Sequence, residues 1–212
     1  PPRSTPLYSS AASDVYKRQF IFRPHIYDGN TVTTPDVLID DVYVADSYGT
    51  NLSISRITND RLTTASEIQV LGDNTIAQAA ILLIAAGAGM LIGIASNHKC
   101  IDQEDPQLFS KPISRQVWRF QNVVDHWEFL SIQLSSGTGE MIQNGRLGEF
   151  TPIDEIIPLI ASNQSSLEKG TAVLCVGLPM LKSGRPSSSY NLKLSDQEKD
   201  QMLELEYQVR QI

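Results

Sequence analysis

The feature that most constrains this sequence is a long stretch without a charged side chain. From Asn74 to His98 there is no Asp, Glu, Lys or Arg. Within it, two apolar runs at 79–84 and 90–94 are separated by a Gly-Ala-Gly sequence at 87–89. Such a segment is expected to be shielded from water, either inside a folded domain or in a membrane.

Three structures are compatible with residues 76–96. The pattern favours a buried hairpin of two apolar strands joined at the glycines. A membrane helix is the second possibility, because the length suffices and Gly89 and Gly93 have small-xxx-small spacing, although no aromatic belt flanks the stretch. The third is a glycine-rich nucleotide loop, but the third glycine of that fingerprint comes one position late.

The composition is that of an ordinary globular protein. Of 212 residues, 41% are apolar and 19% are charged, which argues against disorder, collagen and coiled coil and suggests about one domain. The net charge of −7 argues against nucleic-acid binding and against a polybasic membrane anchor, while leaving room for a local basic pocket. Cys100 and Cys175 have neither metal nor disulfide spacing, so we expect a reducing, cytoplasmic setting.

Most remaining segments predict strands. Short apolar runs predict them at 37–39, 42–44, 67–71, 172–176, 190–194 and 204–209. One helix is expected at 154–161, directly after Pro152, since a helix start tolerates proline. A turn is expected at 28–30, Asp-Gly-Asn.

The N-terminal segment is set apart from the fold. Residues 13–19 resemble a translated sequencing-adapter scar of the kind seen in metagenomic reading frames, so residues 1–19 are expected to be artefactual or disordered. Residues 20–61 are expected to form N-terminal strands and loops, followed by one domain at 62–212.

Two clusters suggest chemistry. His98 lies close in sequence to Asp102, Glu104 and Asp105, a combination that can bind a divalent cation, although an exposed polar loop explains it equally simply. His126-Trp127-Glu128 would place the histidine and the carboxylate on the same side of a strand. They could form an acid–base pair, or His126 could be a partly buried histidine bonded to backbone.

A set of residues follows the order of a known family. They are Leu62-Thr63-Thr64, Ile68-Gln69-Val70-Leu71-Gly72, Thr75, Ser96, His98, Lys111-Pro112, Trp118, Val123, His126-Trp127, Gln143, Gly145, Gly177, Pro179, Asp196 and Tyr207. This order resembles an uncharacterised bacterial family within the fumarylacetoacetate hydrolase superfamily. The resemblance implies a mixed, β-rich α+β fold, a fumarylacetoacetate-hydrolase-like β-sandwich roll, usually in a homodimer, and it favours the hairpin.

The resemblance also implies a metal-dependent chemistry. Members act on 2-oxo acids and acylpyruvates as hydrolases or lyases, and Mg²⁺ or Mn²⁺ holds the 2-oxo carboxylate and stabilises the enolate. The family binds the metal with a Glu-x-Glu pair on a strand and an Asp in a later loop. These positions fall on Gln78, Ala80 and Asn97, so all three anionic ligands are neutral and no metal cofactor is expected.

We therefore expect a pseudoenzyme-like member of the superfamily with impaired activity on 2-oxo acids. Remnant catalytic residues would be His98, His126 and Glu128, and substrate-binding residues Lys111 and Gln143. The alternative is a non-catalytic homodimer that binds a small carboxylate or is purely structural. A membrane-anchored protein that uses residues 76–96 is a third, less favoured hypothesis.

Overall fold

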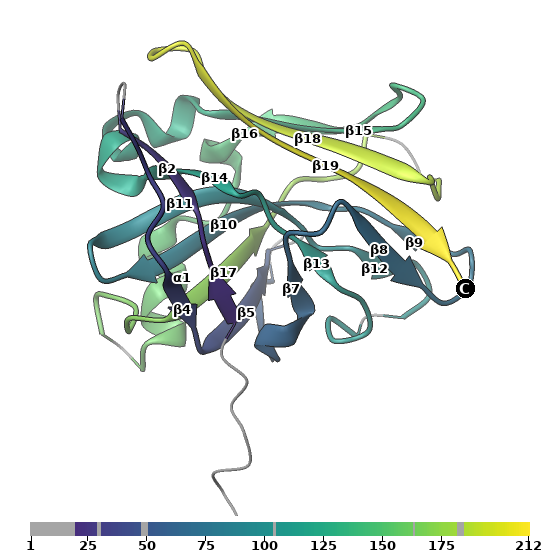
Figure 1. Ribbon diagram of the computed structural model, residues 1–212, viewed down its shortest axis with the longest axis horizontal. Helices are drawn as coiled ribbons and strands as arrows, with labels where there is room; N and C mark the ends of the chain where they lie inside the picture. Colours follow the sequence, from purple (N-terminus) through teal and green to yellow (C-terminus); the bar gives the residue numbers. More distant parts are fainter. Residues whose placement is uncertain (1–19, 29–30, 48–50, 104, 163, 182–184) are drawn as a thin grey trace, which may run out of the picture.

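The fold is described from a computed structural model of the chain (Figure 1). The structure describes residues 20–28, 31–47, 51–103, 105–162, 164–181 and 185–212. The interpretation of residues 1–19 and most of the predicted turn at 28–30 lie outside the described residues, so both stay predictions.

The largest element is an eight-stranded sheet of order β3-β2-β14-β11-β10-β17-β5-β6. Its strands are β2 (His25–Asp28), β3 (Thr31–Thr33), β5 (Asp41–Asp46), β6 (Ser53–Ile57), β10 (Ala79–Ala86), β11 (Gly89–Ser96), β14 (Gln116–Arg119) and β17 (Thr171–Val176). Strand β10 is antiparallel to both β11 and β17, whereas β5 runs parallel to β17. The segments 20–61 and 62–212 therefore share one sheet.

A second, five-stranded sheet of order β16-β15-β18-β19-β8 packs across the first (Figure 1). Its strands are β8 (Glu67–Val70), β15 (Ser131–Ser136), β16 (Met141–Arg146), β18 (Ser189–Asp196) and β19 (Gln201–Gln211). Buried and more exposed residues alternate along β15 and β18, as expected for a sheet with one face in the core and one facing water.

Smaller elements complete the described fold. Two-stranded pairs are β1 (Phe20–Phe22) with β4 (Val37–Ile39), β7 (Leu62–Thr63) with β13 (Lys111–Pro112), and β9 (Thr75–Ile76) with β12 (Lys99–Cys100). The helices are α1 (Ile153–Ile160) and the 3₁₀ helices η2 (Asn59–Arg61), η3 (Phe120–Asn122), η4 (Val124–Phe129) and η5 (Leu147–Glu149).

The uncharged stretch is the hairpin β10–β11, as the pattern and the resemblance both predicted. Its register runs from Ala79 opposite Ser96 to Ala86 opposite Gly89, and Gly89 has a φ of 104°, which favours glycine at the turn. No helix among the described residues is long and apolar enough to cross a membrane.

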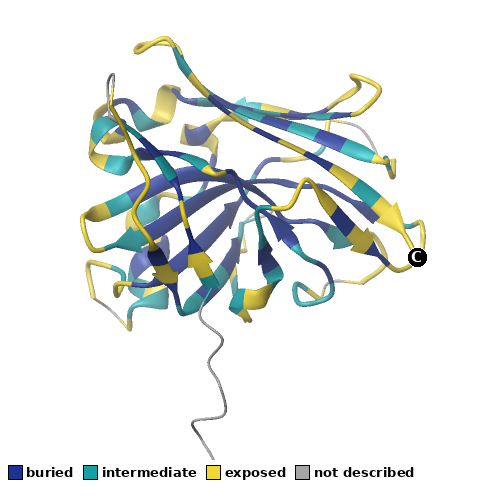
Figure 2. Cartoon of the chain, viewed as in Figure 1, coloured by how far each residue is buried: buried dark blue, intermediate teal, exposed yellow. Residues whose placement is uncertain are grey.

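Burial on both faces explains why the hairpin carries no charge. One face of β10 and β11 packs against the five-stranded sheet, with Ile81 and Ile94 in the same cluster as Leu205. The other face, with Leu82 and Leu91, packs in a second cluster that includes residues of β1 and β4. Figure 2 shows these central strands buried along almost their whole length. A charged side chain at either face would lose its hydration.

The other expected strands at 37–39, 42–44, 67–71, 172–176, 190–194 and 204–209 and the helix at 154–161 are confirmed, with bounds that differ by at most three residues. One local prediction is wrong: His126 and Glu128 do not lie on a strand, because residues 124–129 form η4. His126 is buried there and Glu128 is exposed, so the two side chains do not share a face. Tertiary packing over-rode the β-branched and aromatic composition of this segment.

Candidate functional site

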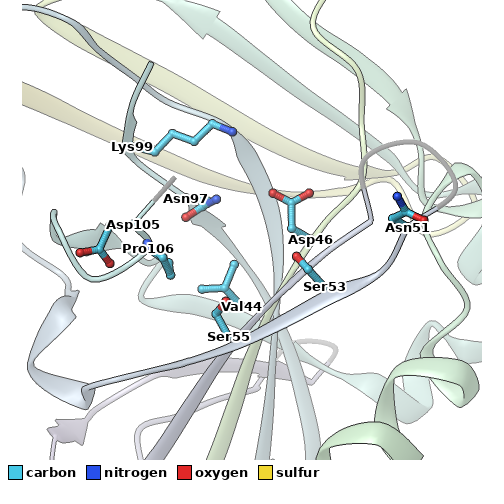
Figure 3. Close-up of a pocket in the computed structure, with 9 residues that line it drawn as sticks. All are labelled: Val44, Asp46, Asn51, Ser53, Ser55, Asn97, Lys99, Asp105 and Pro106. Atoms are coloured by element: carbon cyan, nitrogen blue, oxygen red, sulfur yellow. The ribbon is translucent and has the colours of Figure 1, made fainter. Parts of the chain in front are cut away.

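A cavity of about 360 Å³ lies at one end of the eight-stranded sheet, where β5 and β6 approach the segment after β11 (Figure 3). Its wall is mostly polar and consists of Val44, Asp46, Asn51, Ser53, Ser55, Asn97, Lys99, Asp105 and Pro106. Figure 3 shows the Lys99 ammonium and the Asp46 carboxylate extending toward the space beside Asn97. A cavity of this size and polarity suits a small polar molecule.

Strand register relates the cavity to the three positions that the resemblance assigns to metal ligands. Asp46 pairs with Val176, and Val176 pairs with Ala80, so Asp46 and Ala80 point to the same face of the sheet. They are two strands apart, which at the usual strand spacing is about 10 Å between backbones. Asp46 therefore does not supply a carboxylate at position 80, although it faces the same side of the sheet.

Gln78 and Asn97 lie next to each other where β10 begins and β11 ends. The Asn97 backbone N–H donates to the Gln78 carbonyl oxygen at 2.8 Å, and Asn97 Nδ2 donates to Gln78 Oε1 at 3.3 Å. Both side chains are buried, and Asn97 Oδ1 has no hydrogen-bond partner. Asn97 lines the cavity, but this oxygen has almost no accessible surface.

These residues do not fit the Mg²⁺ or Mn²⁺ that the resemblance implies. Hard cations bind mainly through carboxylates, but the three positions offer two neutral amides and the methyl group of Ala80. The Lys99 ammonium lines the same cavity and would repel a divalent cation. Over the described part of the chain, no group of three His, Cys, Asp or Glu side chains could hold a metal ion.

Three basic side chains influence one another beside the cavity. Lys111 is fully buried, and its Nζ donates to the His98 carbonyl oxygen at 2.6 Å. The pKa of Lys111 is lowered to about 7, chiefly by burial, then by the charge of Lys99, while Asp105 raises it and Arg61 lowers it. Arg61 Nε is also buried without a hydrogen-bond partner. An anion bound here would reduce the repulsion among these cations.

His98, a predicted catalytic residue, lies in a buried network between the two sheets. Its Nδ1 is 3.1 Å from Tyr207 Oη, its Nε2 is 3.1 Å from Thr75 Oγ1, and Tyr207 Oη is 2.7 Å from Ser96 Oγ. Burial, and secondarily Lys111, lowers the pKa of His98 to about 3, so the imidazole is neutral near pH 7. This arrangement suits a hydrogen-bonded bridge rather than a proton donor.

The structure places the other predicted catalytic residues away from the cavity. His126 Nε2 is 3.0 Å from Asp196 Oδ2, and both side chains are buried. Gln201 Nε2 donates to the same carboxylate at 2.9 Å. The His126 hydrogen bond helps to hold the pKa of Asp196 below its usual value against the opposing effect of burial. Neither His126 nor Glu128 lines the cavity.

The two predicted substrate-binding residues have structural partners. Gln143 is fully buried: its Oε1 accepts the Ala79 N–H at 2.7 Å, and its Nε2 donates to the Leu178 carbonyl oxygen at 2.6 Å. Gln143 thus ties β16 to the start of β10. Lys111 does not line the cavity, but two lining residues, Lys99 and Asp105, act on its pKa through their charges. In the suggested metal loop, Asp102 accepts a hydrogen bond from Asn74, while Asp105 lines the cavity.

Sequence reasoning overlooked Asp46 and Arg61 and gave Lys99 no role. A polar residue directly after the apolar run 42–45 is the only local signal for Asp46. No local signal indicates that β12, which carries Lys99, lies near this strand.

A family model described as "Protein of unknown function (DUF2848)" matches residues 40–207. The chain belongs to this family. No curated protein sequence matches this DUF2848 member.

Solved structures show the fold that this DUF2848 member shares. A protein from Yersinia pestis CO92 assigned to the fumarylacetoacetate hydrolase family has a TM-score of 0.62 and 16% identity over 91% of this chain and 100% of its own. A protein from Oleispira antarctica described as a fumarylacetoacetate isomerase/hydrolase has a TM-score of 0.62 and 14% identity over 88% and 99%.

A third similar structure contains ligands. The maleylpyruvate hydrolase from Sphingobium sp. SYK-6, in complex with manganese(II) and pyruvate, has a TM-score of 0.61 and 11% identity over 85% of this chain and 75% of its own. The strand-rich α+β fold expected from the resemblance is confirmed.

Proposed function

We propose that this protein binds a small carboxylate in the cavity beside Asn97 and Lys99, without a bound divalent cation. The observation that carries the proposal is the distribution of charged and neutral side chains at this site. The three positions that the resemblance assigns to metal ligands are neutral, whereas Lys99 lines the cavity and its charge, like that of Arg61, acts on the buried Lys111. Within the lining, the positive charge is that of Lys99, beside the carboxylates of Asp46 and Asp105.

The similar structures support the choice of ligand. The Sphingobium enzyme holds pyruvate together with manganese. A 2-oxo acid or a related small carboxylate is therefore the natural class to test in a cavity of the same fold. Ammonium and guanidinium groups bind carboxylates directly through charge-assisted hydrogen bonds.

We also propose that metal-dependent hydrolase or lyase chemistry on 2-oxo acids is impaired in this chain. His98 is neutral and engaged at both ring nitrogens, and His126 is bonded to Asp196. Without a metal, nothing of comparable charge stabilises an enolate. The proposed role is thus non-catalytic binding. Sedimentation velocity will test the homodimer that the sequence resemblance implies.

The first experiment measures thermal unfolding with pyruvate or oxalate in the presence of EDTA. A ligand at 100 times its Kd stabilises by about 2.7 kcal/mol, a shift of a few degrees for a domain of this size. We expect this shift in the wild type and its loss in Lys99→Met. Lys193→Met is the matched control, because Lys193 lies on β18 and pairs with Glu204 at 3.3 Å. No shift with either anion in the wild type would refute carboxylate binding.

The second experiment tests the proposal that the protein binds no divalent cation at this site. The triple variant Gln78→Glu, Ala80→Glu, Asn97→Asp returns the three carboxylates, and we expect it to bind Mn²⁺ measurably by calorimetry. The wild type should show no Mn²⁺ binding under the same conditions. Tight Mn²⁺ binding by the wild type would mean that other residues rebuild the centre, and acylpyruvate cleavage assays would then be the test of activity.

A further inference from the structure

A second cavity, of about 240 Å³, lies at the turn of the β10–β11 hairpin. Its wall combines residues 85–88 of that turn with the segment 35–38 and with Lys169. The turn is at the opposite end of the hairpin from Gln78 and Asn97, which lie where β10 begins and β11 ends. Strand β10 has 8 residues, which span about 25 Å, so this second cavity is separate from the first.

Most of the wall of the second cavity is apolar. Ile26, Val37 and Leu91 line it, and all three are buried in the cluster on the face of the eight-stranded sheet away from the five-stranded one. Ala86 packs against the same cluster, and Leu38 is 43% exposed. Figure 2 shows the central strands becoming more exposed toward this turn. An apolar group that enters the cavity displaces water from these side chains, which favours binding.

The charged side chains of the wall are Asp36 and Lys169. Asp36 is already paired, because Arg23 Nε donates to its Oδ1 at 2.8 Å. Within the described ranges, Lys169 forms no ion pair. The unpaired charge at this apolar wall is therefore the Lys169 ammonium, and a ligand with one carboxylate would complement it.

The position of Lys169 is set by the backbone beside it. The Gly170 N–H donates to the Ala85 carbonyl oxygen at 2.9 Å, and the Gly170 carbonyl oxygen accepts from the Asp40 N–H at 2.9 Å. The end of the lysine side chain lies over Gly87, since a Cβ added there would be 3.4 Å from both Cε and Nζ of Lys169. The ammonium thus lies at the hairpin turn before a ligand arrives, which reduces the cost of ordering it.

We infer that the second cavity binds a monocarboxylic acid with a short apolar tail. The carboxylate pairs with the Lys169 ammonium, and the tail packs against Val37, Leu38 and Leu91. The volume is below the range of about 300–1,000 Å³ that is usual for drug-sized ligands, so the tail is short. This site is additional to the one proposed beside Lys99, and a molecule as small and polar as pyruvate has too little apolar surface to occupy it.

The experiment compares butyrate, hexanoate and hexanamide. Binding to the full chain is measured by calorimetry and by ligand-observed NMR, with excess pyruvate present to compete at the first cavity. We expect hexanoate to bind about tenfold more tightly than butyrate, because each buried methylene group contributes up to about fourfold. Hexanamide has the same tail without the charge and should bind about threefold more weakly than hexanoate, as expected for a partly exposed ion pair.

Two results of this comparison would overturn the inference. They are the absence of hexanoate binding and equal affinities for hexanoate and butyrate. Neither result bears on the proposed function, which depends on pyruvate or oxalate binding beside Lys99 and is tested separately by thermal unfolding.

A charge variant tests the role of the ammonium. Lys169→Met should weaken hexanoate by about threefold and leave hexanamide unchanged. Lys193→Met is the matched control, because Lys193 lies on β18 and pairs with Glu204. If hexanoate binds Lys169→Met as tightly as the wild type, the lysine does not pair with the carboxylate and the inference is wrong.

Two further variants test the position of the tail. Ala86→Leu fills the cavity and should weaken both hexanoate and hexanamide by at least about tenfold. Because Ala86 packs against the core, Leu38→Asn provides a second change at an exposed position, and it should also weaken both molecules. Far-UV circular dichroism and the thermal transition confirm that each variant is folded. Unchanged hexanoate binding in both variants, or its loss in Lys99→Met, would place the molecule elsewhere and overturn the inference.

Discussion

His98 forms hydrogen bonds through both ring nitrogens, to Tyr207 and to Thr75, and its ring packs edge-on against Tyr190 and Phe109. Such a histidine connects strands of the two sheets and has no ring nitrogen left for a bound molecule. The residue type suggests proton transfer, but its surroundings make it a neutral bridge. Buried polar networks of this kind stabilise a fold when all their members are satisfied.

Titration of His98 should make the protein sensitive to acid. The pKa of His98 is lowered from 6.5 to about 3 in the folded protein, so between these values the unfolded chain binds more protons. Stability from this residue is therefore present above pH 6.5 and is lost as the pH falls toward 3, by at most about 1.4 kcal/mol per pH unit.

Urea unfolding between pH 7 and pH 4 measures this dependence. The variant His98→Asn should be less stable at pH 7 and should have a smaller slope of unfolding free energy against pH than the wild type. His25→Asn is the control, since His25 lies partly exposed on β2. Equal slopes for the wild type and His98→Asn would show that His98 titrates normally.

At the scale of elements, the turn after β18 holds η3 and η4 against the five-stranded sheet. Asp196 accepts from His126, from Gln201 and from the backbone N–H groups of Glu198 and Lys199. The Lys199 ammonium donates to the Asn122 carbonyl oxygen. The buried carboxylate of Asp196 and the nearby ammonium of Lys199 thus join the end of β18 to η3 and η4, which are distant in sequence.

Asp196→Asn should loosen this junction. An amide cannot accept all of these hydrogen bonds, and we expect a loss of about 1–3 kcal/mol of unfolding free energy. Because the pKa of Asp196 is lowered in the folded state, its stabilisation is present above the usual aspartate range and is lost as the pH falls through the lowered value. Hydrogen exchange should become faster across residues 120–129. Asp125→Asn, at an exposed position of η4, is the control. Unchanged exchange in Asp196→Asn would mean that apolar packing alone holds these helices.

For the whole molecule, the N-terminal strands are part of the main sheet and its core. Strand β5 pairs with β17 along its full length, from Asp41 opposite Thr171 to Asp46 opposite Val176. Phe22, Ile39 and Val44 cover the face of the sheet that lies opposite the five-stranded sheet. The candidate cavity also takes part of its wall from β5 and β6.

Residues 62–212 should therefore fail to fold alone. Without residues 20–61, strand β17 loses its parallel partner and the apolar side chains of β10 and β11 face water. We expect residues 20–212 to unfold in one cooperative transition and residues 62–212 to show none by circular dichroism and calorimetry. A cooperative transition of the shorter chain would identify residues 62–212 as an independent domain.

The amino-acid pattern was sufficient for the features that depend on neighbours in the chain. The strands at 37–39 and 172–176, the helix after Pro152 and the apolar hairpin follow from local propensity and burial. The order of residues over 62–212 was sufficient for the fold family. The neutral residues at positions 78, 80 and 97 could also be identified from the sequence, because the residue type at a single position does not depend on the fold.

Tertiary structure decided every feature that depends on residues distant in the chain. The cavity joins Asp46 to Asn97 and Lys99, and His126 meets Asp196 across 70 positions. His98 and Gln143 have buried hydrogen-bond partners that no neighbour in the chain indicates. The charge and hydrogen bonding of a side chain depend on which groups surround it in space. Strand order and sheet packing set those groups, and no local pattern in this sequence records them.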